Sequence, residues 1–223
     1  MKPRTLLVIT AIAFLIAAGF SAWAWGQIPS DTQVPIHWGL NGQPNGWAPK
    51  WVALAIMPIT ILVIGGIFAG IPYVDPRRPN LVRSSTAYLW IASAAIAVIT
   101  VAHIASTAVV LGAKLDIGRI VSLIVGAMFA VIGNFLGKTR SNWFVGIRTP
   151  WTLSSERSWT RTHRLAGYLF VAAGILVILL SFTAPADVLM WGLLGSVGLA
   201  ALIPVIYSYF AWRDDPDRRP FGG

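Results

Sequence analysis

The stretch GNFLGKTRSNWFVGIRTPWTLSSERSWTRTHRLAG, residues 133–167, lies between two strongly apolar runs and carries six of the seventeen basic residues of the chain. Three tryptophans also lie in it, at positions 143, 151 and 159, beside asparagine, threonine and histidine. A segment that only joined two helices would need none of this chemistry. We therefore interpret it as a folded element on a membrane scaffold, and as the first place to look for function.

The composition of the whole chain indicates a membrane protein. Of 223 residues, 56% are hydrophobic and 11% are charged, with a mean hydropathy of +0.70. Soluble domains carry about a quarter charged residues. The net charge of +9 is therefore interpreted as a signal of topology rather than of nucleic-acid binding. The absence of cysteine excludes disulfides, thiolate metal sites and a cysteine nucleophile.

Six apolar runs are of a length suited to crossing a bilayer, which takes about 20 helical residues. We expect an all-α polytopic membrane protein with spans at 5–25, 51–73, 86–112, 120–136, 165–184 and 188–210. The first run is longer than a signal-peptide core and is expected to remain as a helix. We divide the chain into a two-helix module (1–84), a four-helix module (85–210) and a polar tail (211–223).

The basic residues predict the orientation of the helices. With six spans both termini lie on one face, and that face receives fourteen of the seventeen basic residues: Lys2, Arg4, Arg77, Arg78, Arg83, Lys138, Arg140, Arg148, Arg157, Arg161, Arg164, Arg213, Arg218 and Arg219. The opposite face receives Lys50, Lys114 and Arg119. Because basic loops stay on the cytoplasmic side, both termini and the central stretch are predicted to be cytoplasmic. The loop around His37 then faces outward.

Local chemistry predicts a turn followed by a helix in the central stretch. Pro150 disfavours a helical conformation at Thr149, and Gly146 permits a backbone conformation closed to other residues. Ser154 and Glu156 suit the start of a helix. At about 100° per residue, this helix points three arginines outward and four residues toward the bundle, namely Ser155, Trp159, Thr162 and His163. We expect a short amphipathic surface helix between the fourth and fifth spans.

Two interpretations of these residues stay open at this stage. In the structural one, Arg148 caps carbonyls or contacts lipid phosphates, the tryptophans anchor the chain, and His163 makes a local hydrogen bond. In the functional one, a polar set converges at the cytoplasmic mouth of the bundle and recognises a ligand: Asn134, Asn142, Arg148, Thr149, Trp159 and His163. Buried polar groups at membrane depth are expensive, and they serve either function or helix packing.

The two other histidines have similar alternatives. His37 either packs with Trp38 and Trp47 to hold its loop against the bundle, or forms part of an outward surface for a ligand. His103 lies within a span, where we expect a neutral imidazole bonded to a neighbouring helix. His37 and His163 are predicted on opposite faces, so they cannot share a metal ion. The sequence also lacks a His-Glu-x-x-His motif, and we expect no enzyme, no metal and no cofactor.

Residues 142–153, NWFVGIRTPWTL, followed by Trp159 and Thr162-His163, resemble the signature of the SdpI family of immunity proteins. The signature includes Arg148, Thr149, Pro150 and Trp151, and Gly133-Asn134 upstream fits the same pattern. The stretch VPIHW at 34–38, with NGQPNGW at 41–47, is similar to a module of unknown function that often precedes this family. Together the two resemblances cover nearly the whole chain.

The resemblance implies a multi-pass protein of the bacterial cytoplasmic (inner) membrane. Such a protein would confer resistance to a secreted, membrane-active peptide toxin by binding, and could signal to a cytoplasmic repressor. The expected partners are thus membrane lipids, a peptide toxin and a repressor, without direct nucleic-acid contact. A small-molecule or lipid transporter is the alternative. Because the central stretch is predicted to be cytoplasmic, we expect it to act as a clasp or output surface. First contact with a toxin is expected at the His37 loop.

Overall fold

A computed structural model describes residues 3–39 and 42–218. Lys2, Asn41, Arg219 and the last part of the polar tail, which entered the expectations above, lie outside the described residues. In chain order the described elements are α1 (Pro3–Trp25), β1 (Gln33–Trp38), β2 (Pro44–Pro49), α2 (Lys50–Val74), α3 (Arg78–Arg83), α4 (Ser85–Val110), α5 (Ile117–Leu136), α6 (Pro150–Ser154), α7 (Glu156–Thr183) and α8 (Ala186–Arg213).

Six of these helices are long and apolar enough to cross a membrane: α1, α2, α4, α5, α7 and α8. Each has 20 or more residues, and most of its apolar surface is left uncovered by the rest of the protein. Lipid solvates such surface, so this exposure is expected of membrane helices. The prediction of a six-helix polytopic membrane protein is therefore confirmed.

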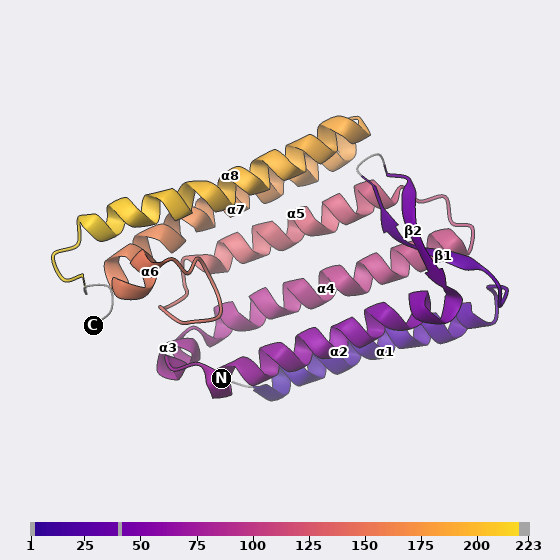
Figure 1. The fold of residues 1–223 in the computed structure, drawn as a ribbon, viewed down its shortest axis with the longest axis horizontal. Coiled ribbons are helices and arrows are strands. Elements are labelled where there is room, and N and C mark those ends of the chain that lie inside the picture. Colours follow the sequence, from indigo (N-terminus) through magenta and orange to yellow (C-terminus); the bar gives the residue numbers. More distant parts are fainter. Residues whose placement is uncertain (1–2, 40–41, 219–223) are drawn as a thin grey trace.

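The six helices lie roughly side by side and give the molecule two distinct ends (Figure 1). One end holds the start of α1, the end of α8, the short helices α3 and α6, and the loop between α5 and α6. The other end holds the β-hairpin and the α4–α5 connection. Lys50 and Arg119 lie at the hairpin end, and the long basic loop lies at the opposite one. This arrangement agrees with the charge asymmetry on which the predicted orientation rests.

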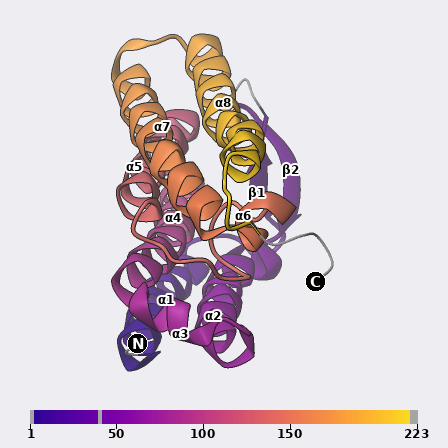
Figure 2. The same cartoon turned by 90° about the vertical axis from the view of Figure 1, so that its left-hand side faces the viewer.

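Helix α4 is the middle of the bundle, contacting α1 and α2 on one side and α5 on the other, while α7 packs between α5 and α8 (Figure 2). The contact between α5 and α7 depends on glycine. A Cβ on Gly174 would lie 2.5 Å from the carbonyl oxygen of Gly126, and one on Gly133 would lie 2.6 Å from the backbone nitrogen of Val171. The two backbones can approach this closely only because no side chain intervenes.

The loop expected between the first two spans contains a two-stranded antiparallel sheet, β1 and β2. Val34 pairs with Ala48, and both side chains are buried. Val34 joins a cluster with Ala24, near the end of α1, and Leu54, near the start of α2. The register shifts on either side of His37. Prolines at positions 35, 44 and 49 obscured these strands in the sequence, because proline is confined to edge strands and bulges.

The expected surface helix differs in detail from the structure. A short helix does lie between the fourth and fifth spans, but it is α6, residues Pro150–Ser154. The segment that we expected to form it is the first part of the spanning helix α7, which begins at Glu156. Ser155, rather than Ser154, caps α7 by accepting a 2.8 Å hydrogen bond from the Ser158 amide. No proline or glycine occurs between 156 and 166, so the helix continues without a break into the apolar run.

Candidate functional site

The loop from residue 137 to 149, here called the signature loop, is shaped by Asn142. Its side-chain amide nitrogen donates to the carbonyl oxygens of Arg140 and Val145, both at 3.0 Å. Its side-chain oxygen accepts from the amides of Phe144 at 3.0 Å and Val145 at 2.7 Å. Asn142 is buried and all its polar atoms are used. The loop therefore folds around this side chain, and Val145 is left pointing into the apolar core formed by α1, α2 and α4.

His163 and Trp159 hold the other side of the signature loop. Their rings stack with centroids 3.9 Å apart, and neither side chain is exposed. His163 Nε2 accepts from the Ile147 amide at 2.9 Å, so the ring proton lies on Nδ1, which donates to the Trp159 carbonyl oxygen at 2.8 Å. Trp159 Nε1 donates to the Thr139 carbonyl oxygen at 3.0 Å. A neutral imidazole satisfies both bonds, and the ring acts as a bridge from α7 to the loop backbone.

Gly146 makes this bridge fit. Its φ is +118°, in a region that other residues rarely adopt. A Cβ at this position would overlap His163 Nε2 and approach Trp159 Cη2 to 3.3 Å. Both the backbone conformation and the packing thus require glycine here. The sequence predicted the special backbone conformation but not the packing against His163.

Thr149 and Thr152 form a capping box at the start of α6. The Thr152 amide donates to Thr149 Oγ1 at 3.2 Å, and the Thr149 amide donates to Thr152 Oγ1 at 3.0 Å. Thr149 is extended, with φ −97° and ψ 162°, which confirms the effect predicted for Pro150. Thr149 Oγ1 also lies 3.0 Å from Ser208 Oγ on α8, and the Trp151 ring meets Tyr209 edge-on at 5.4 Å. The turn is therefore fixed to the last span.

The chain after α8 returns to the start of α7. The Ser155 hydroxyl donates to Asp215 Oδ2 at 2.5 Å, and Asp215 is only 5% exposed. Ser158, one turn into α7, donates to the Ser208 carbonyl oxygen at 2.8 Å. The first turn of α7 is thereby bound to α8 and to the segment that follows it.

The loop between α2 and α4 completes the site, and sequence reasoning missed its part. Arg77 donates to Ser141 Oγ and, at 2.7 Å, to the Leu153 carbonyl oxygen. The buried Asp75 accepts from the Trp143 amide at 3.2 Å, and Asn80 donates to the Ser141 carbonyl oxygen at 2.9 Å. The sequence marked this loop only as short and basic. The run Asp-Pro-Arg-Arg carries no signal for its partners, which lie more than 60 residues away.

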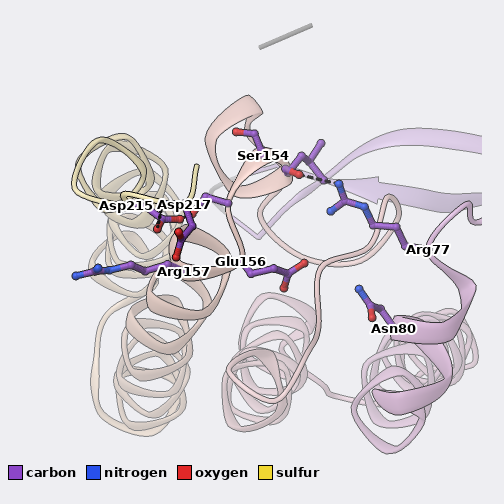
Figure 3. Close-up of a pocket in the computed structure, with 9 residues that line it drawn as sticks. Arg77, Asn80, Ser154, Glu156, Arg157, Asp215 and Asp217 are labelled. Carbon is purple, nitrogen blue, oxygen red and sulfur yellow. Dashed lines mark hydrogen bonds between the residues drawn. The ribbon is translucent and has the colours of Figure 1, made fainter. Parts of the chain in front are cut away.

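A cavity of about 440 Å³ lies between the α2–α4 connection, the start of α7 and the segment after α8 (Figure 3). Arg77 and Asn80 line it from the α3 side, Asp215 and Asp217 line it from the tail, and Glu156 lies between them. The lining is polar and carries both signs of charge.

The expected site residues are only partly brought together. Asn142, Thr149, Trp159 and His163 converge, together with Pro150, Trp151 and Thr162. Thr162 is fully buried, and its hydroxyl has no hydrogen-bond partner among the described residues. Arg148 is exposed and donates to the Trp143 carbonyl oxygen at 2.9 Å. Asn134 is also exposed and lies apart, in a groove between α5 and α7. The three arginines predicted to point outward, at 157, 161 and 164, are exposed as expected.

His37 and Trp38 lie at the opposite end of the molecule, on β1. His37 is exposed, and its Nδ1 donates to Asn45 Oδ1 at 2.5 Å across the hairpin. Trp38 lines a cavity of about 330 Å³ between the hairpin, the start of α5 and the start of α8, where apolar side chains lie beside Asp116 and Arg119. Trp47 on β2 is 54% exposed. The hairpin thus offers aromatic surface beside a hollow.

The third histidine meets the expectation for a buried imidazole. His103 on α4 lies 2.8 Å, through Nε2, from the Ser21 hydroxyl on α1. The Ser21 oxygen is also 2.8 Å from the Leu54 carbonyl oxygen on α2, to which it donates. His103 and Ser21 therefore link α4, α1 and α2. Within the described residues, no group of three or more histidine and acidic side chains could hold a metal ion.

Comparison with known proteins gives a consistent result. Residues 138–208 match the SdpI/YfhL protein family, and residues 12–62 match a domain of unknown function, DUF1648. The immunity protein SdpI of Bacillus subtilis (strain 168) is 25% identical over 215 residues, which cover 96% of this chain and 97% of that protein. No solved structure matches the chain. The expected resemblance is confirmed: the chain matches the SdpI/YfhL family model in its second half and the DUF1648 model in its first part, and it is similar to the immunity protein SdpI over nearly its whole length.

Proposed function

We propose that this multi-pass membrane protein confers resistance to a membrane-active peptide toxin, and that it acts by binding rather than by catalysis. The observation that carries the proposal is the similarity to the immunity protein SdpI over 96% of the chain. Six spans and the family signature in 138–208 support it. The proposed location is the bacterial cytoplasmic membrane, with both termini in the cytoplasm, as the distribution of basic residues favours.

The geometry of the signature loop supports a structural role for its polar residues. Asn142, Thr152, Trp159 and His163 direct their polar atoms to partners within the chain. A ligand could gain hydrogen bonds from them only by breaking existing ones. We therefore propose that these residues are a clasp that sets the relative positions of α2, α5, α7 and α8, and that they do not contact a toxin.

We propose the hairpin as the region of first contact with the toxin. Trp47 is exposed there, and Trp38 lines the neighbouring cavity together with Leu115, Ile117 and Leu189. Amphipathic peptides bind through apolar side chains that enter such hollows, and tryptophan is enriched in interfaces of this kind. We further propose that 1–84 supplies this outer contact and that 85–210 supplies the clasp. A toxin-dependent change in the clasp could be passed to a cytoplasmic repressor through the surface around Arg77 and Glu156.

The transporter alternative has less support. It requires a path that Asn134 and Arg148 share. The groove lined by Asn134 does not include Arg148, which instead caps a carbonyl group of its own loop.

Survival of a toxin-sensitive bacterium tests the proposal. Cells that express the protein are challenged with a panel of membrane-active peptides, including any encoded beside its gene. We expect protection against at least one peptide. The double substitution Trp38→Ala/Trp47→Ala should abolish protection at an unchanged membrane level, whereas Trp191→Ala, at an exposed position of α8, should leave it intact. Absence of protection against the whole panel contradicts the proposal, and equal loss in both variants removes the hairpin from it.

A further inference from the structure

A groove runs along the outside of the bundle where α5 packs against α7, at the end that carries both termini. Its volume is about 590 Å³. It does not overlap the clasp or the hairpin cavity. The residues that line it are Gly133, Asn134, Gly137, Lys138, Arg164, Gly167, Tyr168, Val171, Ala172 and Ile175.

Glycines form the floor of this groove. A Cβ on Gly167 would lie 2.8 Å from the carbonyl oxygen of Gly133, and one on Gly137 would lie 3.4 Å from the Cα of Arg164. Helices α5 and α7 therefore meet backbone to backbone along the floor of the groove.

Two cations stand at the end of the groove nearest the termini. Lys138 and Arg164 are both exposed, and neither forms an ion pair with a described residue. No aspartate or glutamate lines the groove. Lys138 lines the groove, and its Nζ lies 4.8 Å from the centroid of the Phe135 ring, in a cation–π contact. The exposed amide of Asn134, one helical turn before Lys138, adds a hydrogen-bond donor beside the two charges.

The rest of the groove is apolar, and the groove as a whole is about as long as one leaflet is thick. Arg164 and Ile175 are eleven residues apart on one helix, which at 1.5 Å per residue separates them by about 16 Å. The hydrocarbon of one leaflet is about 15 Å thick, half of a bilayer core. Tyr168 is 71% exposed and lies between the charged end and the apolar end. Tyrosine prefers this depth, the boundary between headgroups and hydrocarbon.

We propose that this groove binds one anionic phospholipid of the leaflet that faces the termini. The phosphate lies between Lys138, Arg164 and the Asn134 amide, and one acyl chain lies along Val171, Ala172 and Ile175. A free phosphate would leave the apolar part of the groove unused. A zwitterionic lipid carries a positive group beside its phosphate, so its headgroup has no net negative charge to balance Lys138 and Arg164. Basic pockets between helices on the cytoplasmic side suit anionic headgroups in this way.

Lipid binding to the full-length protein in neutral detergent tests the proposal, with retained lipids resolved by native mass spectrometry. The probes are palmitoyl-oleoyl phosphatidylglycerol and phosphatidylcholine with the same chains. We expect phosphatidylglycerol to bind at least tenfold more tightly. Lys138→Gln/Arg164→Gln should weaken its binding by roughly 30-fold, which corresponds to about 1 kcal/mol for each cation. Arg157→Gln/Arg161→Gln removes the same charge from α7 outside the groove, and should change binding by less than about threefold, or ~0.6 kcal/mol.

A second pair of variants tests the apolar half. Ala172→Trp fills the groove and leaves both cations in place, and it should displace the lipid. Ala201→Trp places the same ring on an exposed position of α8 and should not. Equal binding of the two lipids, or equal loss in the two charge variants, would overturn the proposal. The proposal would also be overturned if millimolar inorganic phosphate or glycerol 3-phosphate displaced phosphatidylglycerol while Ala172→Trp left phosphatidylglycerol binding unchanged. That result would show a site for free phosphate.

Discussion

Gly146→Ala should be among the most destabilising alanine substitutions in the signature loop, for two separable reasons. The first is conformational, because φ is +118° and strained backbone of this kind costs about 1–3 kcal/mol in a residue with a side chain. The second is packing, because the added methyl group would occupy the position of His163 Nε2. His163 is fully buried and stacked on Trp159, so the ring cannot move away freely.

Displacing the imidazole breaks its bond to the Ile147 amide, and a buried unpaired amide costs about 1–3 kcal/mol. The two effects together predict a loss of about 2–6 kcal/mol, which is a large part of the roughly 5–15 kcal/mol that stabilises a typical protein. Gly112→Ala is the matched control. Gly112 has a similar φ of +95°, but a Cβ there would meet nothing within 4 Å, so its substitution should cost about 1–3 kcal/mol from strain alone.

The assay is equilibrium unfolding in mixed micelles with increasing dodecyl sulfate, followed by the fluorescence of the eleven tryptophans. His163→Ala separates the two effects, because removing the imidazole makes room for the methyl group. In that background Gly146→Ala should cost no more than Gly112→Ala does in the unmodified protein. If Gly146→Ala and Gly112→Ala are equally destabilising, or if the cost of Gly146→Ala is the same with and without the imidazole, the packing argument is refuted.

Three further substitutions test the remaining contacts. Asn142→Ala leaves buried loop amides without an acceptor and should lower the free energy of unfolding by about 2–4 kcal/mol. The control Asn134→Ala, at an exposed asparagine, should change it by less than about 0.5 kcal/mol. Equal effects of the two substitutions would contradict the role given to Asn142. A double-mutant cycle of Ser21→Ala and His103→Phe should give a coupling of about 0.6–1.7 kcal/mol, as interhelical hydrogen bonds in membranes do, and strict additivity would mean that the bond contributes nothing. Gly174→Ala should destabilise by about 1–3 kcal/mol through overpacking against α5, measured by the same unfolding titration, and an unchanged midpoint would mean that the two helices separate without cost.

The candidate site residues divide into those that a local pattern reveals and those that it does not. Gly146 and Pro150 restrict their own backbone or that of a neighbour, so their effect was predictable from the residue type alone. The inward face of Ser155, Trp159, Thr162 and His163 was predictable because a helix repeats every 3.6 residues. Their partners were not, since Ile147, Thr139 and Asp215 come close only when separate helices pack.

Asp75 and Arg77 show the limit most plainly. Nothing near them in the sequence indicates that one accepts from Trp143 and the other donates to Leu153. Those contacts exist because an even number of spans returns both segments to one end of the bundle. The prediction for the start of α7 was wrong because it relied too much on a local pattern. The charged residues after 155 suggested a separate surface helix. A helix continues as long as no residue interrupts its hydrogen bonds, so α7 begins at Glu156, before the apolar run.

The sequence by itself determined the class of protein, the number of spans and the asymmetry of charge, because hydropathy and basic residues act through the bilayer and do not depend on which helix neighbours which. It also revealed the signature loop. Only the tertiary structure decided what the loop does with its polar atoms. Those of Asn142, Thr149 and His163 are used within the chain, while Asn134 faces an outer groove and Arg148 lies on the surface. The partners of Thr149 and His163 depend on how separate helices pack, because Ser208 lies on α8 and Ile147 lies in the loop that follows α5.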